Sequence, residues 1–138
     1  MQEGRILKEK TPAGKEPKTD NRGGRRALGL EKEILAADYL CSQGYEILAR
    51  NYYCRNGEID IIARNDGYLV FAEVKYRSSR GCGLPQEAVD RRKIRRIVRA
   101  ARYYLYTQGI PSDTPCRFDV ITILGSRISV IKHAFEAY

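Results

Sequence analysis

Two acidic residues and a lysine lie where a short turn would bring them together. The dipeptide Asp66-Gly67 is a hairpin signal, and a two-residue turn there places Asp60 directly opposite Glu73 on the returning strand. Lys75 shares the face of Glu73, because strand side chains alternate in direction. Opposed carboxylates destabilise a hairpin unless something neutralises them, and their oxygens are hard ligands for Mg²⁺ or Mn²⁺. We therefore predict a divalent metal at Asp60 and Glu73, which a one-residue slip of the turn would remove.

A third carboxylate comes from a predicted helix over residues 26–43. Helical spacing puts Glu33 on its apolar face. Four apolar residues share that face: Leu30, Ala36, Ala37 and Leu40. Burying an unpaired carboxylate is costly, so Glu33 needs a partner. The metal or Lys75 would supply one, and the structural alternative is an ion pair with an arginine at the edge of the apolar stripe.

A second predicted helix, over residues 86–108, divides into an apolar and a basic face. Its apolar residues follow helical spacing and should pack on the sheet. The outward face carries Arg92, Lys93, Arg95, Arg96 and Arg99, with no acidic residue from position 91 to 104. An ordinary solvated helix mixes both signs of charge, so this stripe favours phosphate binding. A merely solubilising face is the alternative.

Turn signals and periodicity give the order α-β-β-β-α-β-β. Strands are predicted at residues 45–53, 57–64, 68–77, 116–124 and 127–132. Helices that flank a mixed sheet in one small α/β domain are the consistent architecture. Residues 1–25 lack periodicity and carry net positive charge, which predicts a mobile basic arm before a single domain at 26–138.

Composition narrows the partners of the protein. The chain has 138 residues, 25 Lys and Arg against 17 Asp and Glu, and a net charge of +8, which favours nucleic acid. No apolar run is long enough to span a membrane, and no export signal precedes the domain, so we expect a cytoplasmic protein. The spacing of the four cysteines matches no zinc motif, and the lone His133 argues against histidine-based nucleases.

Three other charged residues have weaker functional signals. Glu58 has the strand parity of Asp60 but lies nearer the start of the strand, which favours a supporting role. Arg117 and Asp119 alternate onto one face of a later strand, and a structural ion pair is the simplest interpretation.

The acidic and lysine residues also resemble a known signature. Asp60 followed by Glu73-Val74-Lys75 is similar to the PD-(D/E)XK nuclease motif. Four blocks in order are similar to the YraN-like family of predicted bacterial endonucleases, which is related to archaeal Holliday junction resolvases. The blocks are Gly57–Asp60, Phe71–Arg77, Glu87–Lys93 and Arg117–Val120.

The resemblance implies a three-layer α/β/α restriction-endonuclease-like fold. It implies that Asp60 and Glu73 are the metal-binding acids, Lys75 the catalytic lysine and Glu33 the acid carried by the helix. Two positions depart from the pattern, because Ile59 replaces a proline before Asp60, and Lys32 stands where relatives often have glycine.

Three functions remain open at this point. The first is a metal-dependent endonuclease that hydrolyses phosphodiester bonds, with branched DNA as the substrate that the resemblance implies and DNA favoured over RNA. A homodimer would suit a symmetric junction. The second is a non-catalytic nucleic-acid-binding module with the same fold. The third is a scaffold that docks an acidic protein, which explains the arginines but not the paired carboxylates.

Overall fold

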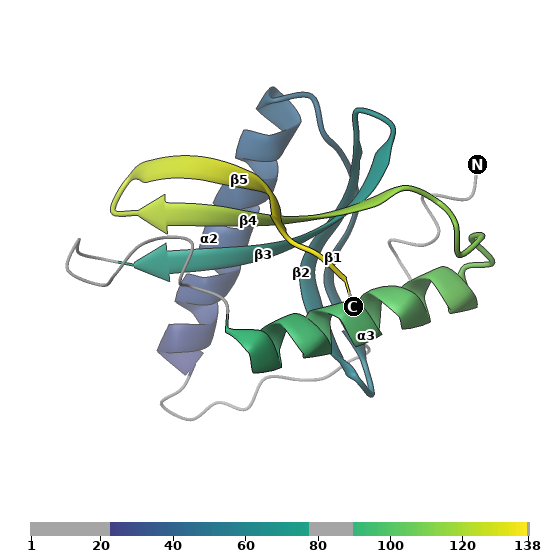
Figure 1. The fold of residues 1–138 in the computed structure, drawn as a ribbon. Coiled ribbons are helices and arrows are strands. Elements are labelled where there is room, and N and C mark those ends of the chain that lie inside the picture. Colours follow the sequence, from purple (N-terminus) through teal and green to yellow (C-terminus); the bar gives the residue numbers. More distant parts are fainter. Residues whose placement is uncertain (1–22, 78–89, 138) are drawn as a thin grey trace.

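The computed structural model describes residues 23–77 and 90–137, with side chains from residue 29 onward (Figure 1). The elements are α2 (Gly23–Ser42), β1 (Glu46–Cys54), β2 (Gly57–Asn65), β3 (Tyr68–Arg77), α3 (Arg91–Thr107), β4 (Cys116–Leu124) and β5 (Arg127–Phe135). This order is the predicted one. None of the helices in the described part of the chain is long and apolar enough to cross a membrane.

The five strands form one mixed sheet in the order β1-β2-β3-β4-β5. All neighbouring pairs are antiparallel except β3 and β4, which are parallel and are separated in the chain by α3. Figure 1 shows α2 and α3 on opposite sides of the sheet, and each helix contributes to a separate apolar core. This three-layer α/β architecture is the restriction-endonuclease-like fold that the sequence predicted.

The two cores show toward which helix each strand side chain points. The core beneath α3 contains Phe71 and Phe118, and the core beneath α2 contains Val70 and Ala72. Side chains alternate along a strand, so Glu73 and Lys75 follow Phe71 onto the α3 face.

The predicted hairpin register is confirmed as far as the last ladder pair. Asn65 pairs with Tyr68, and the register continues to Ile61 opposite Ala72. The turn residues Asp66 and Gly67 have φ angles of 52° and 82°, as a hairpin turn with both central residues left-handed requires. The ladder ends one position before Asp60, so the predicted direct pairing of Asp60 with Glu73 is absent from the β2–β3 ladder. β2 and β3 separate at this point.

The bounds of α3 and β5 differ from the prediction. Asp90 has extended backbone angles and caps α3, since its carboxylate accepts a hydrogen bond from the Lys93 backbone N at 2.9 Å. A continuous helix from residue 86 is therefore wrong, and residues 86–89 lie outside the described part. β5 continues past residue 132 to Phe135, whose ring stacks on Phe118 with centroids 5.0 Å apart.

The first helix also differs at its N-terminal end. The predicted arm at residues 1–25 lies outside the described part, except that residues 23–25 open α2. Leu30 was predicted to face the core but is 47% exposed, whereas Ala36, Ala37 and Leu40 are buried as predicted. Only the later turns of α2 therefore pack on the sheet.

Candidate functional site

Asp60 lies at the point where β2 leaves β3. Its Oδ2 accepts a hydrogen bond from the backbone N of Val74 at 2.8 Å, so a carboxylate replaces the next carbonyl of the ladder. In a regular strand, residues three positions apart point to opposite faces. Ile59 and Ile62 nevertheless both pack into the α3-side core, so the alternation of side chains along β2 changes phase between them. The β1–β2 pairs on either side, Arg50 with Ile61 and Tyr52 with Ile59, bracket Asn51 and Asp60, and Asn51 has a left-handed φ of 54°. This irregularity directs Asp60 into the gap between the strands.

Glu73 is buried, at 5% exposure, and two lysines flank it. Lys75 Nζ lies 3.7 Å from Glu73 Oε2, and Lys93 Nζ lies 3.3 Å from the same oxygen. Lys93 was predicted to bind phosphate on the outward stripe. The structure instead brings it, half-buried, from the first turn of α3 to the carboxylate of Glu73. The site therefore has two ammonium groups and not only the one that the sequence motif supplied.

Glu33 approaches the same gap from α2. Its Oε1 is buried and has no hydrogen-bond partner among the described residues. Burial raises the pKa of Glu33, and the nearby Glu58 carboxylate raises it further. Hydrogen bonds with Asn51 and Asp60 act in the opposite direction, as does the charge of Arg50. Because one oxygen remains unpartnered, an arginine does not satisfy this carboxylate in the way that the structural alternative required.

The carboxylates impose an electrostatic conflict on Asp60. Burial raises the pKa of Asp60 well above its ordinary value, and the charges of Glu73, Glu33 and Glu58 raise it further. The hydrogen bond from Val74 offsets only part of this effect. Oxygen ligands in such a setting suit a hard divalent cation, which would remove the repulsion. The donor chemistry of Glu33, Asp60 and Glu73 thus fits Mg²⁺ or Mn²⁺.

The positions of these side chains set a condition on metal binding. No group of three or more His, Cys, Asp or Glu within residues 23–77 and 90–137 is arranged closely enough to hold an ion. The two lysines already compensate the charge of Glu73. Metal binding therefore requires the carboxylates to draw together and the lysine contacts to loosen.

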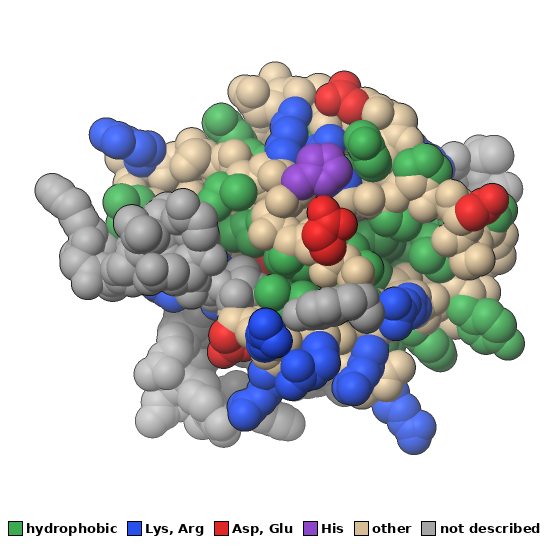
Figure 2. Space-filling view, in the orientation of Figure 1, with side chains coloured by type: hydrophobic (Ala, Val, Ile, Leu, Met, Phe, Trp, Pro, Cys, Tyr) green, Lys and Arg blue, Asp and Glu red, His purple; other side chains and the backbone are tan. Residues whose placement is uncertain are grey.

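The basic stripe of α3 is exposed to solvent. Arg92, Arg95, Arg96 and Arg99 are all exposed, as predicted. Figure 2 shows a row of Lys and Arg side chains along this helix at the lower edge of the molecule. Gly57 positions the row relative to the sheet, because a Cβ at Gly57 would lie only 2.9 Å from the carbonyl oxygen of Arg96. The glycine lets the start of β2 touch the backbone of α3.

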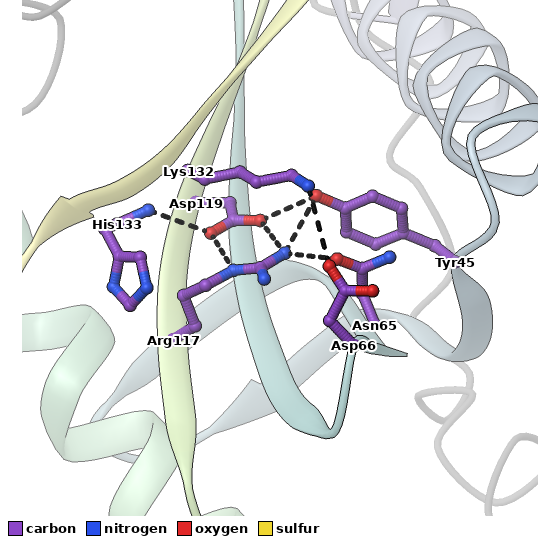
Figure 3. Close-up of polar contacts among 7 residues, drawn as sticks. All are labelled: Tyr45, Asn65, Asp66, Arg117, Asp119, Lys132 and His133. Atoms are coloured by element: carbon purple, nitrogen blue, oxygen red, sulfur yellow. Dashed lines mark hydrogen bonds and ion pairs between the residues drawn. The ribbon is translucent and has the colours of Figure 1, made fainter.

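The sequence did not reveal the full extent of a second polar cluster. Arg117 and Asp119 form the predicted ion pair, with Nε–Oδ1 and Nη2–Oδ2 distances of 2.9 Å (Figure 3). Arg117 Nη2 also donates to Asn65 Oδ1 at 2.8 Å and to the hydroxyl of Tyr45 at 3.0 Å. The Tyr45 hydroxyl donates to Asp119 Oδ2 at 2.9 Å, and the backbone N of His133 donates to Oδ1 at 3.2 Å.

This cluster is separate from the candidate site. Arg117 and Asp119 pair with Val70 and Ala72 of β3, whose side chains lie on the α2 face. Glu73 lies on the other face. Asp119 is fully buried, and both of its carboxylate oxygens accept hydrogen bonds. The cluster therefore has a structural role. Asn65, a polar residue at the end of an apolar strand, was the available signal in the sequence.

Comparisons with known proteins place these residues in a family context. A model of the family described as "Uncharacterised protein family UPF0102" matches residues 32–123. A UPF0102 protein of Lachnoclostridium phytofermentans is 56% identical over 114 residues, which cover 83% of this chain and 97% of that protein. A UPF0102 protein of Persephonella marina is 44% identical over a stretch that covers 78% of this chain and 92% of that protein. A UPF0102 protein of Moorella thermoacetica is 46% identical over a stretch that covers 80% of this chain and 97% of that protein. The matched range contains every residue of the candidate site.

Proposed function

The chain belongs to the UPF0102 family, consistent with the YraN-like resemblance, and from that premise we propose that it is a metal-dependent endonuclease that hydrolyses phosphodiester bonds of nucleic acid. The observation that carries the proposal is the buried Asp60 carboxylate, which feels the charges of both Glu33 and Glu73, beside the two lysines that contact Glu73. A buried carboxylate such as Asp60, whose pKa is raised by burial and by neighbouring carboxylates, is typical of catalytic centres. DNA is the favoured substrate, and branched DNA is the form that the family resemblance suggests.

The proposed chemistry assigns a role to each side chain. The metal ion, Mg²⁺ or Mn²⁺, would be held by Glu33, Asp60 and Glu73. It would polarise the phosphate and activate a water molecule. Lys75 would donate hydrogen bonds from its ammonium group to the attacking water or to a phosphate oxygen that gains charge. Lys93 would take over part of the charge compensation of Glu73 when Lys75 turns to the phosphate. The exposed arginines of α3 would hold the neighbouring phosphates and fix the register of the strand.

A nuclease assay tests the proposal directly. Branched, duplex and single-stranded DNA would be incubated with the protein in Mg²⁺, in Mn²⁺ or in EDTA. We expect cleavage only with metal, and its loss in Glu73→Gln. Glu46→Gln, which alters an exposed glutamate of β1, is the matched control and should cleave normally. Metal-independent cleavage, or equal cleavage by Glu73→Gln, would contradict the proposed centre.

A non-catalytic nucleic-acid-binding module is the second candidate function. It is favoured by the two lysines on Glu73, because they neutralise the carboxylate without a metal. On this alternative the protein binds nucleic acid through α3, leaves every substrate uncut in Mg²⁺ and Mn²⁺, and shows no heat of Mn²⁺ binding by calorimetry. Measuring binding and cleavage on the same preparation separates the two functions.

A further inference from the structure

The basic face of α3 continues into two exposed tyrosines. At 100° per residue, Tyr103 and Tyr106 fall within the same solvent-facing arc as Arg92, Arg95 and Arg99. Tyr106 is 82% exposed and Tyr103 is 43% exposed. Figure 2 shows hydrophobic side chains protruding beside the right-hand end of the basic row, where α3 ends. The surface therefore carries cations along its length and aromatic rings at its C-terminal end.

Tyr106 has no structural reason to be aromatic within the described part of the chain. Neither apolar core includes it, and no ring contact or hydrogen bond of its side chain occurs there. Tyr104, which is two positions away, shows the contrast: it is 1% exposed and its ring packs edge-on against Tyr52, with centroids 5.2 Å apart. The Tyr106 ring is available to a partner.

The charge of α3 indicates what that partner is. The helix has no acidic residue, and its exposed cations precede the two rings along one arc. Such a combination of basic and aromatic side chains on one surface fits single-stranded nucleic acid, in which phosphates meet arginines and bases stack on rings. In a continuous duplex the neighbouring base pairs cover the faces of each base, so a ring can stack only where bases are unpaired.

We propose that Tyr106, assisted by Tyr103, stacks on unpaired nucleobases and so directs the protein to nucleic acid that contains single-stranded nucleotides. This inference rests on the proposed nucleic-acid binding and specifies its substrate class. Tyr106 is 13 residues along α3 from Lys93, which is about 20 Å at the rise of an α-helix. That distance equals about six base-pair steps of B-DNA. A duplex that lies along α3 and ends about six base pairs from the candidate centre would therefore place its first unpaired bases near Tyr106.

A single fluorescent reporter tests the stacking. The chain contains no tryptophan, so Tyr106→Trp introduces one. We expect its fluorescence to be quenched by a single-stranded oligonucleotide of about 12 nucleotides, the upper range for one binding site. An abasic strand of equal length and charge should bind but should not quench. Equal quenching by both strands, or by neither although both bind, would overturn the proposal.

Affinities give an independent measurement. Tyr106→Ala should weaken binding of the single-stranded oligonucleotide by about tenfold or more, whereas binding of a blunt duplex of equal charge should change less than twofold. Tyr106→Phe should restore the affinity, because the ring and not the hydroxyl stacks. Tyr53→Ala is the matched control, since Tyr53 is 51% exposed and lies on β1 outside α3.

The outcomes separate this inference from the proposed function. If the wild type binds both oligonucleotides and Tyr106→Ala binds them equally well, the stacking is refuted and nucleic-acid binding stands. If the wild type binds neither oligonucleotide at low salt, both are refuted, and a protein partner for α3 becomes the better interpretation. Cleavage is not needed for either conclusion, so a loss of catalysis cannot mimic a loss of stacking.

Discussion

Glu73 is the side chain at which the two lysines of the site meet. Lys93 lies closer to its Oε2 than Lys75 does, at 3.3 Å against 3.7 Å. Lys93 thus holds the closer ion pair, and Lys75 is the lysine that the nuclease motif assigns to the reacting phosphate. The proposed function assigns compensation of charge at rest to Lys93 and stabilisation of charge during the reaction to Lys75.

Substitution of Lys75 separates these two roles. We expect Lys75→Ala to retain Mn²⁺ and DNA binding, because Lys93 and the arginines remain. Cleavage should fall by about 10²-fold or more if Lys75 supplies a typical electrostatic contribution to the transition state. Single-turnover kinetics and calorimetry on one preparation measure both quantities. Intact cleavage together with lower stability in EDTA would show instead that Lys75 only neutralises the acids.

Asp60 makes stability depend on pH in the absence of metal. Burial first, and then Glu73, raise the pKa of Asp60, so the folded protein binds this proton more tightly than the unfolded chain does. The stabilising contribution is complete below the ordinary aspartate pKa of about 3.9 and is lost as the pH rises through the higher folded value. In EDTA at pH 7, Asp60→Asn should therefore raise the melting temperature by a few degrees.

The advantage of Asp60→Asn should vanish at about pH 4, where the wild-type carboxyl group is also protonated. Asparagine keeps an oxygen that can accept the Val74 hydrogen bond, so the comparison isolates the charge. Asp38→Asn, at an exposed position of α2, is the control and should change the melting temperature little at either pH. A destabilised Asp60→Asn protein at pH 7 would contradict this electrostatic picture.

At the scale of elements, α3 connects the basic surface to the acidic centre. Reversing one exposed arginine should weaken DNA binding for all sequences, because phosphates and not bases are contacted. We expect Arg99→Glu to reduce the slope of log affinity against log salt by about one. Arg127→Glu makes the same charge change at the exposed β4–β5 turn and should leave the slope nearly unchanged. Equal slopes for the two variants would show that the stripe only solubilises.

Elements that depend on local chemistry were predictable from the sequence. The hairpin register follows from Asp66-Gly67, whose left-handed angles few other dipeptides tolerate. The start of α3 was placed too early, because residues 86–89 are compatible with a helix, although Asp90 is a residue type that commonly caps one. The contact between Lys93 and Glu73 depends on the distance between α3 and the sheet, which Gly57 sets through a tertiary approach.

The candidate site was predictable in part for the same reason. Asp60, Glu73 and Lys75 follow strand parity, and Glu33 follows helical spacing, so their faces could be derived. The change of phase in side-chain alternation at Asp60 could not be derived, because it depends on the left-handed Asn51 of the neighbouring strand. That irregularity is why Asp60 bonds to Val74 and does not pair directly across the ladder from Glu73.

At the scale of the whole molecule, the buried cluster around Arg117 joins the loop before β1, the β2–β3 turn, β4 and β5. Burial raises the pKa of Tyr45, and the Asp119 charge raises it further, so the phenol stays a donor. Replacing one partner leaves the others buried and unpaired. Asp119→Ala should therefore lower the free energy of unfolding by about 3–5 kcal/mol, as denaturant titration would measure. Retention of full stability would show that the remaining polar groups find water.

Function should tolerate the loss of stability if the protein still folds. Tyr45→Phe is the milder variant, which removes one hydroxyl and should lower the free energy of unfolding by about 1–3 kcal/mol. Cleavage and DNA binding at low temperature should match the wild type, because Tyr45 lies on the opposite face of the sheet from Glu73.

The separation of β2 from β3 also has a consequence for the exchange of backbone amide hydrogens with solvent. The segment of β3 near Val70 is paired with a neighbouring strand on both sides, with β2 and with β4. Beyond Ala72 the β2 ladder has ended, and the Val74 amide depends on the carboxylate of Asp60. We therefore expect the amides near Val70 to exchange slowly and the Val74 amide to exchange faster, through local opening. Protection of the Val74 amide should rise when the carboxylates are held together, which makes it a residue-specific sensor of occupancy at the candidate centre.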